Sequence, residues 1–252
     1  MHHTLLFVDI GTHMGQEYNA LFKTSNKKYW QHYMRHLGHT LKKGGDKISL
    51  KEFRKMRDNA SIIRANRSRI KYIMMDPNPF LFSLPVYREA DIAFCAALSE
   101  NTKQASLMKL FFANHERLGQ GSSLFEAKPN INIDDFTTVL NIDSNYFAHM
   151  LKDHFDSECG ENFSVILRLN NEGAEVGVIK SFATAFGAQL KGVLGSLADV
   201  AKVHGQNELN EIHSFMHSTG IPFIPLYSSF TSWPNAIKFI SQVIEKNITF
   251  ES

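Results

Sequence analysis

Two mainly apolar segments far apart in the chain constrain its fold more than any other feature. They run from Leu5 to Ile10 and from Val165 to Leu169, and polar residues and glycines follow each of them at once. Apolar runs of this kind, without regular polar alternation, are typical of parallel strands covered on both faces. In an open sheet of such strands, ligands bind beyond the carboxyl ends. We therefore expect the chemistry of this protein where these two segments end.

The first expected strand ends in a turn that contains a carboxylate, Asp9, and two glycines, Gly11 and Gly15. The glycines permit a tight turn and a close approach of a ligand to the backbone. A helix expected over residues 15–22 would direct its N-terminal amides toward the same space. The spacing Asp-x-Gly-x-x-x-Gly differs from the dinucleotide fingerprint and from the P-loop. Asp9 would repel a pyrophosphate but suits the cationic amino-acid end of S-adenosylmethionine; an ordinary strand–turn–helix corner is the alternative.

A second carboxylate, Asp76, ends the next expected strand, residues 69–76, and a Pro-Asn-Pro turn follows it. An acidic residue at this position of a βαβ unit can accept hydrogen bonds from ribose hydroxyls. The alternative is a plain turn, because Asp, Asn and Pro are common in loops. Residues 90–100 predict a third short strand, whose small side chains could leave a slot for a flat ring.

Five short stretches occur in the order in which they are found in FkbM-type methyltransferases, and the chain resembles this family. The stretches are Asp9–Gln16, Asp76–Pro79, Ala96–Glu100, Gly121–Leu124 and Leu167–Glu175. The family consists of S-adenosylmethionine-dependent enzymes, mostly assigned to O-methylation of sugars and natural products. The resemblance covers most of the chain except roughly residues 23–68. It implies a class I methyltransferase fold, S-adenosylmethionine as cofactor and a glycan or other small hydroxylated molecule as methyl acceptor.

The resemblance also implies which residues form the site. On the methionine side of the cofactor we expect Asp9, Gly11, Thr12, His13, Gly15 and Gln16. Near the ribose we expect Asp76 and Asn78, and near the adenine Ala96, Ala97 and Leu98. The catalytic residues expected at the acceptor side are Glu172 and Asn170, and Asn170 is also expected to contact the cofactor.

Two positions depart from the family pattern. Asn170 stands where the family has an aspartate, and Asp76 stands where the family often has a glutamate. An amide orients ligands through hydrogen bonds, but it is no general base and is a weak ligand for a hard cation. The departure at Asn170 argues against metal-assisted deprotonation of the acceptor. It leaves Glu172 as the candidate base, or a reaction without a base.

Composition bounds the class of protein. The 252 residues are 43% hydrophobic and 21% charged, which suits one large core. Only Cys95 and Cys159 are present, which fits a reducing compartment, and the 12 histidines are scattered along the chain. We therefore predict no metal site. No apolar run approaches the roughly 20 residues of a membrane span, and a strand is expected almost at residue 1, so a cytoplasmic protein without membrane contact is expected.

Positive charge is concentrated between Lys23 and Lys71. This stretch holds 15 Lys and Arg against three Asp and Glu, a net charge of +12, although the whole chain carries only +2. We expect an inserted helical segment at about residues 23–68 that forms a flap over the cofactor mouth, with a break at Gly44 and Gly45 and a capped helix starting after Ser49. Three aromatic residues of its first helix are expected to attach the flap to the body of the protein: Tyr29, Trp30 and Tyr33. It could attract an anionic acceptor or a nucleic acid; a merely solvated surface is the alternative. RNA methylation and a cofactor-binding module without activity therefore remain open alternatives to O-methylation.

The rest of the pattern alternates between expected strands and helices. Residues 107–113 predict a strand, residues 133–140 and 146–154 predict helices, and residues 234–247 predict a closing helix. This alternation favours an α/β fold with a doubly wound, mostly parallel, Rossmann-like sheet in a single domain over residues 1–252. The sequence gives no indication of the oligomeric state.

Overall fold

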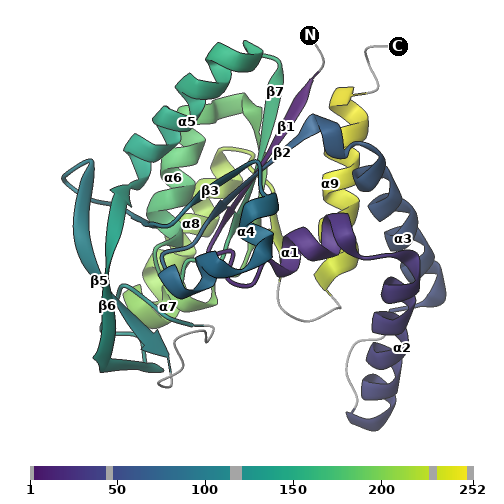
Figure 1. Ribbon diagram of the computed structural model, residues 1–252, viewed down its shortest axis with the longest axis horizontal. Coiled ribbons are helices and arrows are strands. Elements are labelled where there is room, and N and C mark those ends of the chain that lie inside the picture. The colour runs from purple at the N-terminus through teal and green to yellow at the C-terminus, as the bar shows by residue number, and fades with distance from the viewer. Residues whose placement is uncertain (1–2, 44–47, 114–120, 227–231, 249–252) are drawn as a thin grey trace.

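The computed structural model describes residues 3–43, 48–113, 121–226 and 232–248, and a six-stranded parallel sheet forms its centre (Figure 1). Its order is β3-β2-β1-β7-β8-β9. The strands are β1 (Thr4–Ile10), β2 (Ile70–Met75), β3 (Ile92–Phe94), β7 (Phe163–Leu169), β8 (Leu190–Gly195) and β9 (Phe223–Pro225). Each neighbouring pair is parallel. This order reverses direction beside β1, as in doubly wound folds, and confirms a Rossmann-like α/β architecture.

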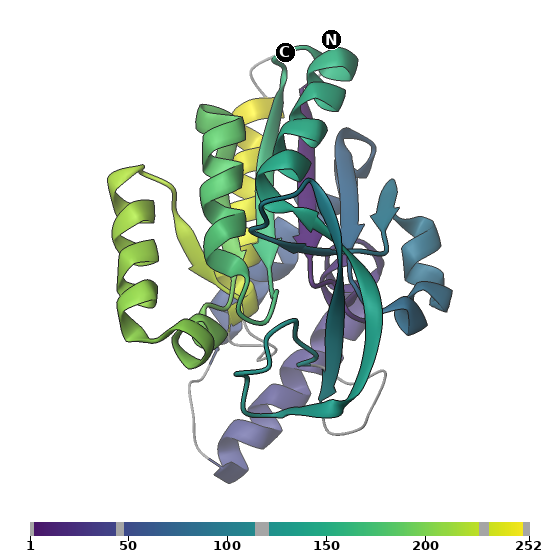
Figure 2. The same cartoon turned by 90° about the vertical axis from the view of Figure 1, so that its left-hand side faces the viewer.

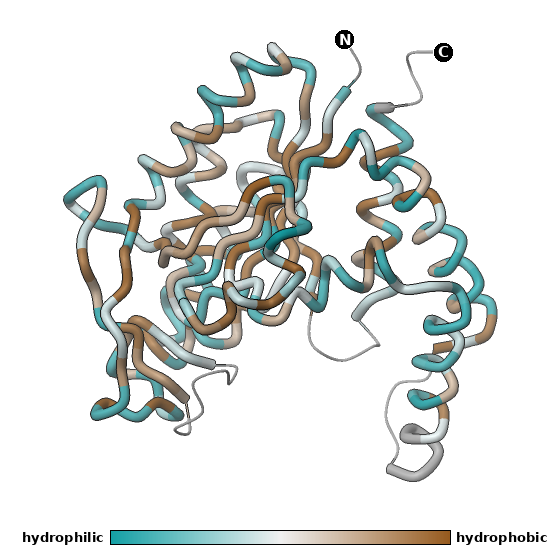
Figure 3. Tube along the Cα trace, viewed as in Figure 1, coloured by the Kyte–Doolittle hydropathy of each residue, from teal (hydrophilic) through white to brown (hydrophobic). Residues whose placement is uncertain are grey.

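Helices cover both faces of this sheet. One face carries α5 (Ser144–Cys159), α6 (Glu175–Phe186), α7 (Ala198–His204) and α8 (Gln206–Ser218). The other carries α1 (Gln16–Tyr18), α2 (Asn26–Lys43), α3 (Leu50–Ala65), α4 (Pro85–Glu89) and α9 (Trp233–Ile248). Successive residues of β1 alternate between these two cores, because side chains along a strand point to opposite faces. Figure 3 shows the hydrophobic residues concentrated along the central strands.

A smaller sheet projects beside the main one and has the order β4-β6-β5 (Figure 2). Its strands are β4 (Ala97–Ser99), β5 (Ala105–Ala113) and β6 (Ile131–Asp143). The strand expected over residues 90–100 is thus two strands, β3 and β4, in separate sheets. The helix predicted over residues 133–140 is wrong, because these residues belong to β6 and pair with β5 in antiparallel register. The many β-branched and aromatic residues of this stretch fit that pairing better than a helix.

The basic segment after β1 forms the helices α2 and α3. Ser49 and Glu52 make the predicted capping box at the start of α3. This helix packs against α9 and connects β1 to β2, so it is a regular crossover helix of the sheet. The expected break at residues 44–45 lies outside the described residues. Two side chains of α2, Tyr29 and Tyr33, are buried as expected for residues that attach it to the body, whereas Trp30 is 48% exposed.

The start of β1 and the end of α9 lie at the same edge of the molecule (Figures 1 and 2). Because β1, β2 and β7 run in parallel, their carboxyl ends meet at the opposite edge. This opposite edge carries the pocket described next.

Candidate functional site

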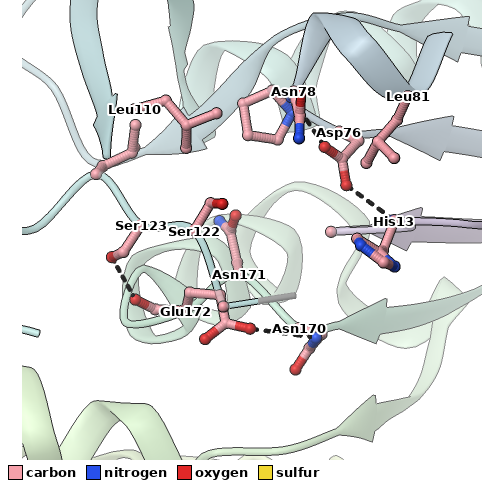
Figure 4. A pocket seen from close by; sticks show the side chains of 14 residues that line it. His13, Asp76, Asn78, Leu81, Leu110, Ser122, Ser123, Asn170, Asn171 and Glu172 are labelled. Atoms are coloured by element: carbon pink, nitrogen blue, oxygen red, sulfur yellow. Dashed lines mark hydrogen bonds between the residues drawn. The ribbon is translucent and has the colours of Figure 1, made fainter. Parts of the chain in front are cut away.

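A pocket opens at the carboxyl ends of β1, β2 and β7 (Figure 4). It is lined by residues of the loops that follow these strands and by residues 121–124, which precede β6. The space that water could fill measures about 50 Å³. Pockets that enclose a small organic ligand measure about 300–1,000 Å³. A nucleoside-sized ligand would therefore extend into the open mouth or displace residues 121–124.

The loops after β1 and β7 touch through their backbones at Gly11. Its φ is +75°, and a Cβ added there would lie 2.0 Å from the carbonyl oxygen of Asn170. The Gly11 amide donates to the carbonyl of Met75 at 2.8 Å, and the Asn170 amide donates to that of Ile10 at 3.0 Å. Only glycine fits both the positive φ and the close approach. The predicted glycine at this position therefore holds three strand ends together.

Asp76 faces the pocket, as the sequence predicted, and its carboxylate is held by backbone groups. Its Oδ2 accepts from the amide of His13 at 2.8 Å, and its Oδ1 accepts from the amide of Asn78 at 2.9 Å. Burial raises the pKa of Asp76, and these two amides oppose the rise. The Asn78 side chain accepts from the amide of Phe80 at 3.0 Å and starts the turn behind it. Each Asp76 oxygen keeps a lone pair for a further donor.

Asp9 does not line the pocket, contrary to the expectation that it contacts the cofactor. It is fully buried on the face of the sheet that carries α3 and α9. The hydroxyl of Tyr72 donates to its Oδ2 at 2.7 Å, and Nη1 of Arg168 donates to its Oδ1 at 3.1 Å. The strand alternation of β1 decides this, because Ile10 turns to one face and Asp9 to the other. Burial raises the pKa of Asp9 to about 7, although Arg168 opposes the rise.

Arg168 has a role in the site that the sequence did not predict. Its Nη2 donates to Oε1 of Glu17 at 2.6 Å, and its Nη1 donates to the carbonyl of Gly11 at 2.7 Å. The guanidinium is buried with two carboxyl groups, those of Asp9 and Glu17. One cation beside two acids favours a proton on one of them, in accord with the raised pKa of Asp9. Through its bond to the carbonyl of Gly11, Arg168 thus fixes the glycine turn after β1.

The other residues expected around the methionine end shape the turn rather than line the pocket, with one exception. Thr12 is buried and its hydroxyl donates to the carbonyl of Asp9 at 2.8 Å. Gly15, at φ +69°, precedes α1. The Gln16 side chain lies 3.3 Å from the ring of His13. His13 is the exception: it lines the pocket, and its own φ is +51°.

The residues expected around the adenine do not reach the pocket. Ala96, Ala97 and Leu98 are all buried. The first and third belong to the core under α5 and α6, and Ala97 belongs to a small core beneath the second sheet. The small side chains of this stretch, which suggested a slot for a flat ring, are explained by this packing.

Asn170 and Glu172 both line the pocket, as predicted. Nδ2 of Asn170 lies 3.5 Å from Oε1 of Glu172, a long contact (Figure 4). Glu172 has a φ of +55°, which is uncommon for a residue with a side chain. The hydroxyl of Ser123 donates to its backbone carbonyl at 2.9 Å and supports this conformation. Burial raises the pKa of Glu172, against the effect of its ion-pair partner Lys128.

Lys128 and Ser122 were not predicted as functional residues. The side chain of Lys128 is only 3% exposed, pairs with Oε2 of Glu172 and donates to the carbonyl of Gly121 at 2.9 Å. Ser122 lines the pocket, and its buried hydroxyl has no hydrogen-bond partner among the described residues. No local pattern could have revealed Lys128, because it lies 44 residues before Glu172. For Ser122, the Gly-Ser-Ser-Leu stretch was the available signal.

The second glutamate of the segment after β7, Glu175, is structural. It accepts from the amides of Asn171 and Gly173, each at 2.8 Å, and is fully buried. Burial raises its pKa to about 7. The side chain of Asn171 donates to the carbonyl of Leu98 at 2.6 Å, which ties this loop to β4.

No described residue of the basic segment 23–68 lines the pocket, so the predicted flap does not cover it. Two of its arginines are engaged elsewhere. Arg64 donates to the carbonyl of Thr24 at 3.3 Å, and Arg67 pairs with Asp91 at 2.9 Å. Over the described ranges, no three His, Cys, Asp or Glu side chains gather as metal ligands would. Nor is any helix in those ranges both long and apolar enough to cross a bilayer.

Comparison with protein-family models, with curated proteins and with solved structures returned no match. The resemblance to FkbM-type enzymes therefore rests on the motifs of the sequence.

Proposed function

We propose that this protein is an S-adenosylmethionine-dependent methyltransferase that methylates a hydroxyl oxygen of a sugar or another small acceptor. The observation that carries the proposal is the position of Asp76. Its carboxylate stands at the carboxyl end of β2, faces the pocket and adjoins the glycine turn after β1. In Rossmann-like sheets, an acid in this part of the fold binds ribose hydroxyls. A cofactor that contains a nucleoside would supply such ribose hydroxyls to the carboxylate of Asp76.

The remaining pocket groups suit the rest of such a cofactor. Gly11 lines the pocket, and its turn lets the loops after β1 and β7 meet there. The buried hydroxyl of Ser122, which has no hydrogen-bond partner in the described ranges, and the amide of Asn170 offer hydrogen bonds inside the same pocket. The cationic end of the cofactor would meet these groups and not Asp9, whose charge is already engaged by Arg168.

The chemistry requires little of the protein beyond alignment. S-adenosylmethionine supplies a methyl group bound to a sulfonium sulfur. Holding an acceptor oxygen in line with that methyl group supplies much of the rate enhancement. Asn170 can orient a hydroxyl but cannot deprotonate it, whereas the Glu172 carboxyl can.

Calorimetry tests the cofactor part of the proposal. We expect the folded protein to bind S-adenosylmethionine and S-adenosylhomocysteine at micromolar to millimolar concentrations. Absence of binding at millimolar ligand would refute the proposal. Incubation with methyl-labelled cofactor and separate pools of glycans, small phosphorylated sugars, RNA and DNA then tests the acceptor. We expect label in the glycan or sugar pools.

One observation favours a second candidate, a cofactor-binding module without transferase activity. The Glu172 carboxyl is paired with Lys128, and Asn170 replaces the acid that the related motif carries. Cofactor binding without label in any pool would support this candidate. Label in RNA alone would instead support a nucleic-acid methyltransferase.

A further inference from the structure

Charged groups approach the Glu172 carboxyl from two elements outside the strand ends. Lys128 reaches it from the segment before β6 and forms an ion pair with Oε2. Asp199, in the first turn of α7, stands close enough to the same carboxyl group to raise the pKa of Glu172. Lys202, one turn later, holds Asp199 through a contact of 2.8 Å between Nζ and Oδ1. Two neighbouring carboxyl groups, those of Asp199 and Glu172, therefore lie between the exposed Lys202 and the buried Lys128.

This arrangement places a cation and an anion at one carboxyl group that faces the pocket. Lys128 is anchored independently, through its bond to the Gly121 carbonyl, so its position does not depend on Glu172. Asp199 is likewise held by Lys202. Glu172 itself has a backbone φ of +55°, which is uncommon for a residue with a side chain. Oε1 remains directed toward Asn170 and the pocket (Figure 4).

We propose that Lys128 and Asp199 are positioning residues that hold Glu172 as the general base for the acceptor hydroxyl. The inference rests on the proposed methyltransferase function. Glu172 takes the hydroxyl proton on Oε1 while the acceptor oxygen forms its bond to the methyl carbon. The carbon–sulfur bond breaks, its electron pair stays on sulfur, and the proton leaves Glu172 for solvent when the product departs.

The two partners act on Glu172 in opposite directions. A neighbouring cation favours the ionised carboxyl, and a neighbouring anion disfavours it. The pKa of Glu172 is raised by burial, lowered by Lys128 and raised by Asp199. The other charged groups near it are Lys202, which acts on it through Asp199, and Glu175 at the start of α6. Asp76 and His13 stand across the same pocket.

The test uses Lys128→Met and Asp199→Asn, which remove one charge each at nearly constant volume. The titration of the Glu172 carboxyl is followed by NMR of protein carrying carbon-13-labelled glutamate, with Glu172→Gln assigning the signal. We expect the midpoint to move up by about 1–3 pH units in Lys128→Met and down by at least about half a unit in Asp199→Asn. If the protein transfers methyl groups, the acidic limb of the kcat profile must move in the same two directions.

Lys152→Met is the matched control, because it breaks the partly buried Lys152–Asp156 pair on α5. It should move neither the midpoint nor the profile. Midpoints that do not move in opposite directions in the two variants would overturn the inference. Should Lys128→Met fail to fold, Asp199→Asn alone decides, since a midpoint unchanged or raised contradicts the role of its charge. Calorimetry with S-adenosylhomocysteine separates the two proposals. If the wild-type protein does not bind this ligand, the proposed methyltransferase function is refuted. The midpoints of the titration test only the effect of Lys128 and Asp199 on Glu172.

Discussion

At the scale of single residues, Asp76 and Asp9 show that two aspartates at the ends of neighbouring strands can have different roles. Asp76 lines the pocket, and Asp9 is buried against Arg168. We predict that Asp76→Ala weakens binding of S-adenosylhomocysteine by about 1–3 kcal/mol, because ribose hydroxyls lose their acceptor. Asp9→Asn should change that affinity much less and should lower the free energy of unfolding. Calorimetry and chemical denaturation of both variants measure the contrast, and equal losses of affinity would contradict it.

A second prediction at this scale concerns Gly11. Gly11→Ala should destabilise the protein and weaken cofactor binding, because the new methyl group would meet the Asn170 carbonyl. Gly160→Ala is the control, since Gly160 also has positive φ but no atom of a described residue within 4 Å of an added Cβ. Thermal unfolding of the pair separates the clash from the backbone strain that both share. Similar losses in the two variants would show that strain alone matters.

The sequence predicted some of these residue roles and not others. Asp76, Asn170 and Glu172 could be predicted because each follows a recognisable strand, and the carboxyl ends of parallel strands meet. The burial of Asp9 was not predictable from its spacing, since one position along a strand changes the face. The partner Lys128 comes from a distant loop, and only the folded chain shows its contact.

At the scale of elements, the basic segment is divided between a crossover helix and a helix away from the pocket. Lys27, Lys28 and Arg35 are exposed on α2, and the first two stand near its N-terminus. We predict that reversing all three to Glu leaves the affinity for S-adenosylhomocysteine within about twofold and slightly raises the melting temperature, because acids favour a helix N-terminus. Arg67→Glu breaks the contact with Asp91 and should therefore lower the melting temperature. Reduced affinity for S-adenosylhomocysteine in the triple variant would contradict the position of α2 away from the pocket.

The element predictions succeeded where periodicity was long and failed where it was short. The capped α3 and the helix α5 were predicted, because each presents apolar residues at helical spacing. β6 was read as a helix, because its apolar residues match both periods over a few positions. These residues form a strand because they pair with β5. Pairing between two segments cannot be predicted from the sequence of either segment alone.

At the scale of the whole molecule, buried carboxyl groups make stability depend on pH. Asp9 and Glu175 each have a pKa raised by burial to about 7. A carboxyl group whose pKa is higher in the folded than in the unfolded state stabilises most below the unfolded value of about 4. That contribution is lost as pH rises through 7. We predict that Glu175→Gln flattens the fall of the unfolding free energy between about pH 4 and 7, as measured by urea denaturation at several pH values. An unchanged slope would mean that Glu175 titrates normally.

The buried guanidinium of Arg168 carries the positive charge that faces the carboxyl groups of Asp9 and Glu17. Arg168→Met should cost about 3–5 kcal/mol of unfolding free energy at neutral pH, because it leaves two buried acids without a cation. The loss should shrink at low pH, because burial raises the pKa of Asp9 to about 7 and this carboxyl group takes up a proton there. Denaturant titrations at pH 5 and pH 8 measure the difference, and an equal loss at both values would refute the electrostatic cause.

The edge at which β1 begins and α9 ends is opposite the edge that carries the pocket. Attachment at the start of β1 or the end of α9 therefore leaves the mouth of the site free. A sensor surface that holds the protein by either of these elements presents the pocket outward, so small-molecule libraries can be passed over one immobilised sample. The search for the acceptor can then proceed by direct capture, before any methyl transfer has been observed.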